Sequence, residues 1–172
     1  MGELSVLALP GIPEVREGDD LAGLIRATGV ELRPDDVLCV AHKVVSKAEG
    51  RVRRLADIEP GHQATEMASV SGKDPRHVQA VLDEAAVVVR AVGGHLICRT
   101  RHGFVCANAG VDRSNTGIDD AVVLLPEDPD ASARALRAAL GCAVVVTDSF
   151  GRAWRVGQAE VAIGVAGLAP LD

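Results

Sequence analysis

Residues 128–146 read DPDASARALRAALGCAVVV, a helix pattern that runs directly into a strand pattern. Asp128 precedes Pro129 at the start of a predicted helix over Asp130–Leu140, and Gly141 ends it, because proline suits the first helical turn and glycine the left-handed end. Cys142–Val146 is an apolar run typical of a buried strand. A link of one glycine is shorter than usual, so either the geometry is tight there or a segment is missing.

The rest of the chain mixes helix and strand patterns without a regular alternation. Helices are expected from Asp19 or Asp20 to Ala27 and over Lys43–Gly50, Ala64–Val70 and Pro75–Glu84, the last with Asp74 as its cap. Strands are expected over Leu4–Leu9, Asp36–Ala41, Ala86–Ala91, His95–Thr100 and Gly103–Ala107. A chain of 172 residues suffices for one domain with a sizeable core. We predict a single α/β (mixed α+β) domain with flanking helices, not a regular doubly wound sheet.

Two short acidic segments, predicted to be loops, each follow an apolar run: Asn108–Asn115, which contains Asp112, and Thr147–Arg152, which contains Asp148. A carboxylate at a strand end, beside small residues, an amide or a hydroxyl, can hold a hard divalent cation against a phosphate, because such ions prefer oxygen ligands. The two segments therefore indicate one metal–phosphate site. The alternative is that both aspartates only form turns with their own backbone.

The composition argues against several classes of function. The 18 Lys and Arg residues stand against 24 Asp and Glu residues, so the net charge of -6 disfavours non-specific nucleic-acid binding. The three aromatic residues, Phe104, Phe150 and Trp154, are too few for a base-stacking surface. We therefore predict no nucleic-acid partner, and a core built from aliphatic side chains.

The apolar runs and the cysteines bear on the compartment. The longest apolar stretch, Val161–Leu171, is interrupted by glycine and proline and falls short of the ~20 residues of a spanning helix, so no membrane association is expected. Pro10 and the absence of a basic leader argue against a secretion signal. The cysteines lack Cys-x-x-Cys spacing and lie in or beside apolar runs, which favours buried, reduced thiols and a cytoplasmic protein.

Several motifs, in order, resemble a known family, the coenzyme F-420:L-glutamate ligases, also called F-420-0:gamma-glutamyl ligases. The resemblance extends over essentially the whole chain, and the motifs that carry it are Leu9–Pro13, Glu17–Leu21, Val45–Arg51, Asn108–Asn115, Leu124–Asp130 and Val146–Arg152. It implies a gamma-glutamyl ligase domain that joins L-glutamate to the coenzyme F-420 precursor, using GTP and an acyl phosphate. It also implies a homodimer. Relatives continue beyond the last residue of this chain and have a longer helix before Cys142, so we expect a domain that is incomplete at its carboxyl-terminal side.

The resemblance also implies roles for individual residues. Asp112 and Asp148 would bind a divalent ion, Mg2+ or Mn2+, and Ser149 would bind a second one. GTP would be contacted by Gly11, Ile12, Pro13, His42, Lys43, Lys47 and Asn115. Lys47 would act with the two aspartates in catalysis, and Arg152 and Arg155 would orient the acidic precursor.

Other interpretations of these residues remain open. Lys47 could be a solvated helix residue, and His42 stands where relatives commonly have Ser or Thr. The other histidines lack metal-ligand spacing and are expected to be structural. Arg152 and Arg155 could simply pack on Trp154. For the whole chain, the alternatives are a non-catalytic, truncated nucleotide- or metal-binding relative, or the ligase part of a bifunctional ligase and flavin-dependent reductase.

Overall fold

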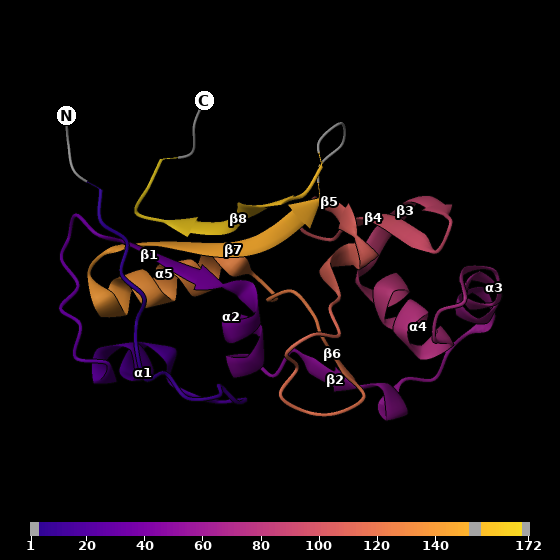
Figure 1. Ribbon diagram of the computed structural model, residues 1–172, viewed down its shortest axis with the longest axis horizontal. Coiled ribbons are helices and arrows are strands. Elements are labelled where there is room, and N and C mark those ends of the chain that lie inside the picture. The colour runs from indigo at the N-terminus through magenta and orange to yellow at the C-terminus, as the bar shows by residue number, and fades with distance from the viewer. Residues whose placement is uncertain (1–3, 152–155, 170–172) are drawn as a thin grey trace.

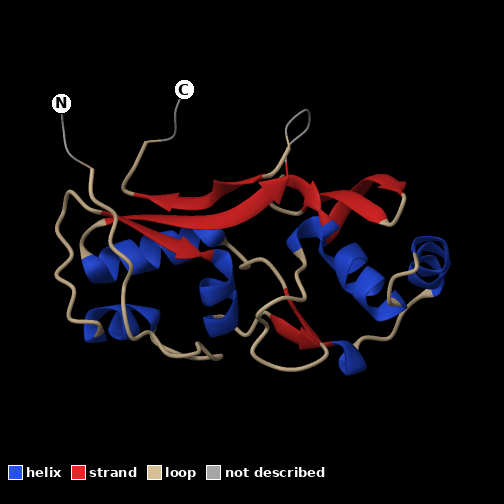
Figure 2. Cartoon of the chain, in the orientation of Figure 1, coloured by secondary structure: helices blue, strands red, loops and turns tan. Residues whose placement is uncertain are grey.

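The computed structural model describes residues 4–151 and 156–169. Its helices lie on one side of two small sheets that follow one another along the long axis of the molecule (Figures 1 and 2). The mixture of parallel and antiparallel strands with flanking helices confirms the predicted mixed α/β class.

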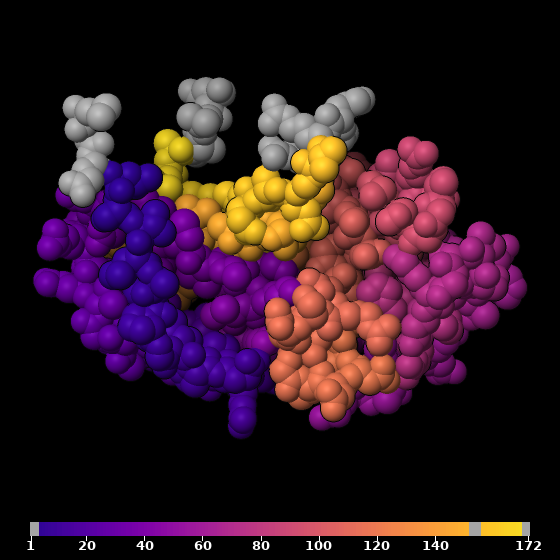
Figure 3. Space-filling view, in the orientation of Figure 1, coloured from indigo at the N-terminus to yellow at the C-terminus, as the bar shows by residue number. Residues whose placement is uncertain are grey.

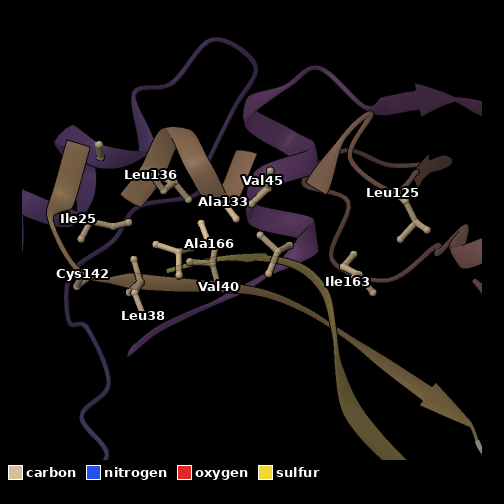
Figure 4. Packing of buried hydrophobic residues seen from close by; sticks show 13 residues of the cluster. Ile25, Leu38, Val40, Val45, Leu125, Ala133, Leu136, Cys142, Ile163 and Ala166 are labelled. Carbon is tan, nitrogen blue, oxygen red and sulfur yellow. The ribbon is translucent and has the colours of Figure 1, made fainter. Parts of the chain in front are cut away.

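The first sheet has the strand order β1-β7-β8. Strand β1 (Val37–Ala41) pairs in parallel with β7 (Ala143–Gly151), which pairs antiparallel with β8 (Gln158–Ala166). Helices α1 (Leu21–Ala27), α2 (His42–Ala48) and α5 (Pro129–Leu140) belong to this half. Leu38, Val40 and Ile163 from the strands meet Val45, Ala133 and Leu136 from the helices in one core (Figure 4).

The second half has the sheet β3-β4-β5 and its own core. Strands β3 (Ala85–Val92), β4 (His95–Thr100) and β5 (Val105–Ala107) are antiparallel, and helices α3 (His62–Ser71) and α4 (Pro75–Glu84) pack beside them. The ribbon β2 (Val52–Arg54) with β6 (Ala121–Val123) and the short helices Leu55–Asp57 and Asn108–Gly110 lie between the halves in sequence and space (Figure 1).

The helix-to-strand link after α5 is tight, as one of the two interpretations of residues 128–146 required. The Asp128 side chain accepts a hydrogen bond from the Ala131 amide, and Gly141 ends the helix with φ 81°. Cys142 is buried, and the Ala143 amide already donates to the Asp36 carbonyl next to β1. Two residues therefore suffice to pass from the helix into the sheet.

Three local expectations are wrong. Leu4–Leu9 forms no strand, and its Leu4 and Val6 side chains are exposed, because an apolar run becomes a strand only where a neighbouring strand pairs with its backbone. Thr147–Gly151 is the second half of β7 instead of a loop, since β8 pairs with it to its end. Cys39 is exposed, whereas Cys98, Cys106 and Cys142 are buried free thiols.

The cap of α4 gives a prediction about stability. The Asp74 carboxylate accepts from the Arg76 amide and pairs with the Arg76 guanidinium at 2.6 Å, and these contacts lower its pKa from 3.8 to about 2. Replacing Asp74 by Ala is expected to reduce the free energy of unfolding by about 1 kcal/mol at neutral pH. Because the folded-state pKa is depressed, this contribution is complete above the unfolded pKa and is lost as pH falls through about 2.

Denaturant unfolding of both proteins along an acid series measures this difference. Asp74→Asn is the control, because it keeps an N-cap acceptor without the charge. A difference that persists unchanged in strong acid would show that the charge of Asp74 contributes nothing.

Within residues 4–151 and 156–169, no helix has the length and apolar character needed to cross a membrane.

Candidate functional site

A cleft of about 590 Å3 lies where the two halves meet. The end of β7 and the start of β8 form one wall, and β5, the loop after it and the connection from α3 to α4 form the other. Asp112, Asp148 and Ser149 all line this cleft. The structure thus brings the two predicted acidic segments together.

Asp148 is positioned by the unequal lengths of neighbouring strands. Strand β1 ends at Ala41, opposite Thr147, so Asp148 is the first residue of β7 beyond its parallel partner, although β8 still pairs with it through Val161. Asp148 therefore lies at a strand end, as predicted, only relative to β1. Relative to β8 it lies within the paired strand. The side chain is largely buried, with 16% of its surface exposed.

The contacts of Asp148 are concentrated on one carboxylate oxygen. Its Oδ1 accepts a hydrogen bond from the Ser149 amide at 2.8 Å and lies 3.3 Å from His42 Nε2. The buried His42 ring is 3.4 Å from Ser46 Oγ through Nδ1. Both contacts with described residues involve Oδ1, so the other carboxylate oxygen, Oδ2, is available to a ligand. His42 is therefore a neighbour of Asp148 in the core of the site.

Asp112 is held by α2 and by its own turn. Its Oδ2 lies 2.7 Å from Lys43 Nζ, and its Oδ1 accepts from the Ser114 amide at 2.7 Å. Lys43 Nζ also donates to Ser114 Oγ at 2.6 Å. Burial favours the protonated acid, but the hydrogen bonds from Lys43 and Ser114 outweigh it, so the pKa of Asp112 lies below its usual value. The carboxylate is ionised and already holds a positive group.

Ser149 lines the cleft at the adjoining position of β7, and its hydroxyl bonds to Glu160 of β8, which is not among the cleft residues. The contact follows from the antiparallel register, which places Glu160 opposite Ser149. Sequence reasoning did not select Glu160, because eleven residues and a turn separate it from Ser149 and no motif joins them.

Lys47 lies on the same helix as Lys43 but faces a second hollow, with a volume of about 520 Å3. This hollow is also lined by residues 14–17 and 116–118. The Lys47 side chain is 10% exposed and its ammonium pairs with Glu14, so it is not the solvated helix residue of the alternative interpretation. Glu14, which directly follows the predicted loop, is a further site residue that sequence reasoning missed.

The remaining predicted nucleotide contacts adjoin lining residues of this hollow in the sequence. Gly11, Ile12 and Pro13 lead into Glu14, and Ile12 packs against the first core. Asn115 is exposed and has a φ of 52°. It stands between Ser114, which bonds to Lys43, and Thr116, which lines the hollow. Figure 3 shows the N-terminal segment, in indigo, reaching the orange loop near residues 113–120. Arg152 and Arg155 lie outside the described residues.

The donor set at the cleft fits a magnesium-like ion better than a zinc-like one. Mg2+ is usually held by one or two carboxylates together with water and phosphate oxygens, and Asp112 and Asp148 are such carboxylates. The described part of the chain contains no group of three or more His, Cys, Asp or Glu side chains that could bind a metal without a ligand's help. The Lys43 ammonium against Asp112 shows that positive charge is stabilised here.

Comparison with known proteins gives consistent matches. Residues 11–172 match the family model described as F-420-0:gamma-glutamyl ligase. Proteins named coenzyme F-420:L-glutamate ligase are 42% identical in Methanothermobacter thermautotrophicus, over 98% of this chain and 70% of the relative, and 48% identical in Methanopyrus kandleri, over 98% and 69%. The relative from Natronomonas pharaonis is 47% identical, over 96% of this chain and 66% of its own length.

Proposed function

Because this chain belongs to the F-420-0:gamma-glutamyl ligase family, we propose that it joins L-glutamate to the coenzyme F-420 precursor in an amide bond, with GTP as co-substrate and an acyl phosphate as intermediate. The observation that carries this proposal is the convergence of Asp112 and Asp148, from separate segments, on the wall of one cleft.

The chemistry requires activation of a carboxylate. A carboxylate does not react usefully with an amine at neutral pH, so a phosphoryl group is first transferred to it from the nucleotide, and the amine of glutamate then displaces phosphate. Catalysis of this kind is mostly alignment and neutralisation of charge. We propose that Asp112, Asp148 and Ser149 hold Mg2+ or Mn2+. When bound, such ions neutralise phosphate charge and orient the reacting oxygens.

We assign the second hollow to the nucleotide. Lys43 and Lys47 lie one helical turn apart on α2. Lys47 lines this hollow, whereas Lys43 contacts Asp112 of the cleft. Asn115 and the Gly11–Pro13 loop directly adjoin lining residues of the hollow in the sequence. Both ammonium groups are paired with carboxylates, Lys43 with Asp112 and Lys47 with Glu14. A phosphate group can replace these partners, since it offers the same charge-assisted hydrogen bonds and more acceptor oxygens. GTP binding thus includes an exchange of ion pairs.

We also propose that the protein acts as a homodimer in the cytoplasm. Val87, Val89 and Val92 of β3 are between 43% and 58% exposed, and an apolar row on such a strand supports contact with a second copy. The free thiols Cys39, Cys98, Cys106 and Cys142 support a reducing compartment.

An isotope experiment tests the acyl phosphate. The full-length protein is incubated with GTP, Mg2+, L-glutamate and precursor whose reacting carboxylate carries heavy oxygen. Transfer of the phosphoryl group makes a carboxylate oxygen the bridge to phosphorus, and attack of the amine releases that oxygen with phosphate. We expect the label in inorganic phosphate. Amide product without labelled phosphate would exclude the intermediate, and no product at all would favour a non-catalytic binding protein.

Lys47 gives a prediction about the nucleotide. Replacing it by Ala is expected to raise the dissociation constant of a non-hydrolysable GTP analogue, with Mg2+, roughly ten- to hundredfold, because a charge-assisted contact of about 1.5–3 kcal/mol is lost. Isothermal titration calorimetry measures this constant.

Glu14→Gln is the matched variant, because it removes the other half of the Lys47 ion pair. If Lys47 binds phosphate, Glu14→Gln leaves the affinity unchanged or increases it. If the pair only holds the N-terminal segment in place, both variants weaken binding alike. Unchanged affinity in Lys47→Ala removes this lysine from the nucleotide site.

A further inference from the structure

The distribution of lysine in this chain is unusual. Of its 18 Lys and Arg residues only three are lysines, Lys43, Lys47 and Lys73. Lys43 bonds to Asp112, Lys47 lines the second hollow, and Lys73 lines the Asp112–Asp148 cleft. The first two belong to the proposed nucleotide site, whereas the function described so far does not use Lys73.

Lys73 is held in the cleft wall by the connection between α3 and α4. Its Nζ donates a hydrogen bond to Asn108 Oδ1 at 2.9 Å. Asn108 directly follows β5 and also lines the cleft. Burial lowers the pKa of this ammonium below its ordinary value. No carboxylate among the described residues forms an ion pair with it, so its charge is compensated by an amide oxygen only. A partly desolvated ammonium of this kind gains free energy from an anion.

The acidic groups near Lys73 are engaged elsewhere. Asp74 pairs with Arg76 at 2.6 Å, and Asp112 pairs with Lys43 at 2.7 Å. Arg113, a second cation in the cleft wall, is half-exposed and only 3.5 Å from Asp120 at the surface, which is a weak pair. Among the described residues, Lys73 is therefore the cation of this wall without a carboxylate partner, and the partner of Arg113 is weakly held.

His77 lies in the same wall as these charged groups. It lines the same wall, is buried, and its Nδ1 has no hydrogen-bond partner among the described atoms. Burial, followed by the charges of Lys73 and Arg113, lowers the pKa of His77, so the ring is neutral at neutral pH. The histidine therefore adds no positive charge to the wall that contains Lys73 and Arg113.

We propose that Lys73 and Arg113, with the Asn108 amide, form a binding site for an anionic oxygen group of the acidic substrate that reacts in this cleft. The inference rests on the proposed ligase function and assigns residues outside the nucleotide and metal sites. Asn108 already accepts from Lys73, so its amide hydrogens are the part that can donate to the same anion. Two substrates offer the required chemistry: L-glutamate, through its carboxylates, and the coenzyme precursor, through its acidic groups.

Protection from amine modification tests this site directly, because this chain contains three lysines, and fragmentation of the modified peptides distinguishes Lys43 from Lys47. The full-length protein, with a non-hydrolysable GTP analogue and Mg2+, is treated by reductive dimethylation and analysed by peptide mass spectrometry. One sample has no further addition, one contains the precursor, and one contains glutarate, which has the two carboxylates of glutamate and no amine to react. A fourth sample contains the protein without the nucleotide analogue.

We expect the nucleotide analogue to protect Lys43 and Lys47, and an acidic compound to slow modification of Lys73 several-fold beyond the analogue alone. Protection by glutarate assigns the site to glutamate, and protection by the precursor assigns it to the precursor. Protection of Lys73 by neither, or by the analogue alone, overturns the inference. If Lys43 and Lys47 are not protected by the analogue, the proposed nucleotide site fails, which is a separate result.

Steady-state kinetics gives the second readout. Lys73→Gln, which retains a hydrogen-bond donor for Asn108, is expected to raise KM for one acidic substrate roughly ten- to hundredfold, with the GTP dissociation constant unchanged. Arg113→Ala should raise KM for the same substrate. Arg134→Ala is the control, because Arg134 is an exposed arginine of α5 paired with Asp128. Unchanged KM for both substrates in Lys73→Gln rejects the site.

Discussion

Replacing Asp148 by Asn is expected to lower kcat for amide formation by at least roughly a hundredfold to a thousandfold, with the fold retained. The variant keeps the size of the side chain and an acceptor oxygen for the Ser149 amide. It removes the negative charge of the carboxylate, which we propose binds the metal ion. Loss of a preorganised electrostatic group in an active site typically costs about 2.7–4 kcal/mol. Asp112→Asn should have an effect of similar size, because both carboxylates line the same cleft.

Activity assays with GTP, precursor and glutamate measure this loss, and circular dichroism checks the fold. Asp35→Asn serves as the control, because Asp35 is exposed in the loop before β1. Mn2+ binding in the presence of a GTP analogue, followed by electron paramagnetic resonance, gives a readout that does not depend on turnover. Unaltered Mn2+ binding in the double variant Asp112→Asn/Asp148→Asn would falsify the assignment of these residues as metal ligands.

Replacing Gly164 by Ala is expected to reduce the free energy of unfolding by about 3 kcal/mol, at the upper end of the range for overpacking a core. Strand β8 passes so close to the start of α5 that a Cβ at Gly164 would lie 2.3 Å from the Pro129 carbonyl oxygen. Both groups are backbone and cannot rotate away, so the helix must move off the sheet. At about 2–4 °C per kcal/mol for a chain of this size, the melting temperature should fall by roughly 6–12 °C.

Gly151→Ala is the matched control, since Gly151 lies in β7 and a Cβ there would meet nothing within 4 Å. Thermal and denaturant unfolding of the unaltered protein, Gly164→Ala and Gly151→Ala measures the differences in stability. Equal stability of Gly164→Ala and the unaltered protein would show that α5 has room to shift at this contact.

Elements whose signals lie within one segment were predicted well. Helix α4 spans Pro75–Glu84 as predicted, with Asp74 as its cap, because the cap, the proline and the apolar periodicity are all local. The passage from α5 into β7 follows in the same way from Pro129, Gly141 and the valines after Ala143. Motifs also sufficed to select Asp112 and Asp148, which line one cleft.

Features that depend on pairing between distant segments were not predictable. Leu4–Leu9 has the apolar composition of a strand but no neighbour among the described residues to supply hydrogen bonds, while the polar residues Thr147–Ser149 extend β7 because β8 lies beside them. Backbone hydrogen bonds between strands and contacts between side chains are made across space, and local propensity carries no information about which segment provides them. For the same reason the Lys47–Glu14 pair and the placement of Lys73 beside Asn108 emerged only when the chain was folded, although each of these residues was visible in the sequence.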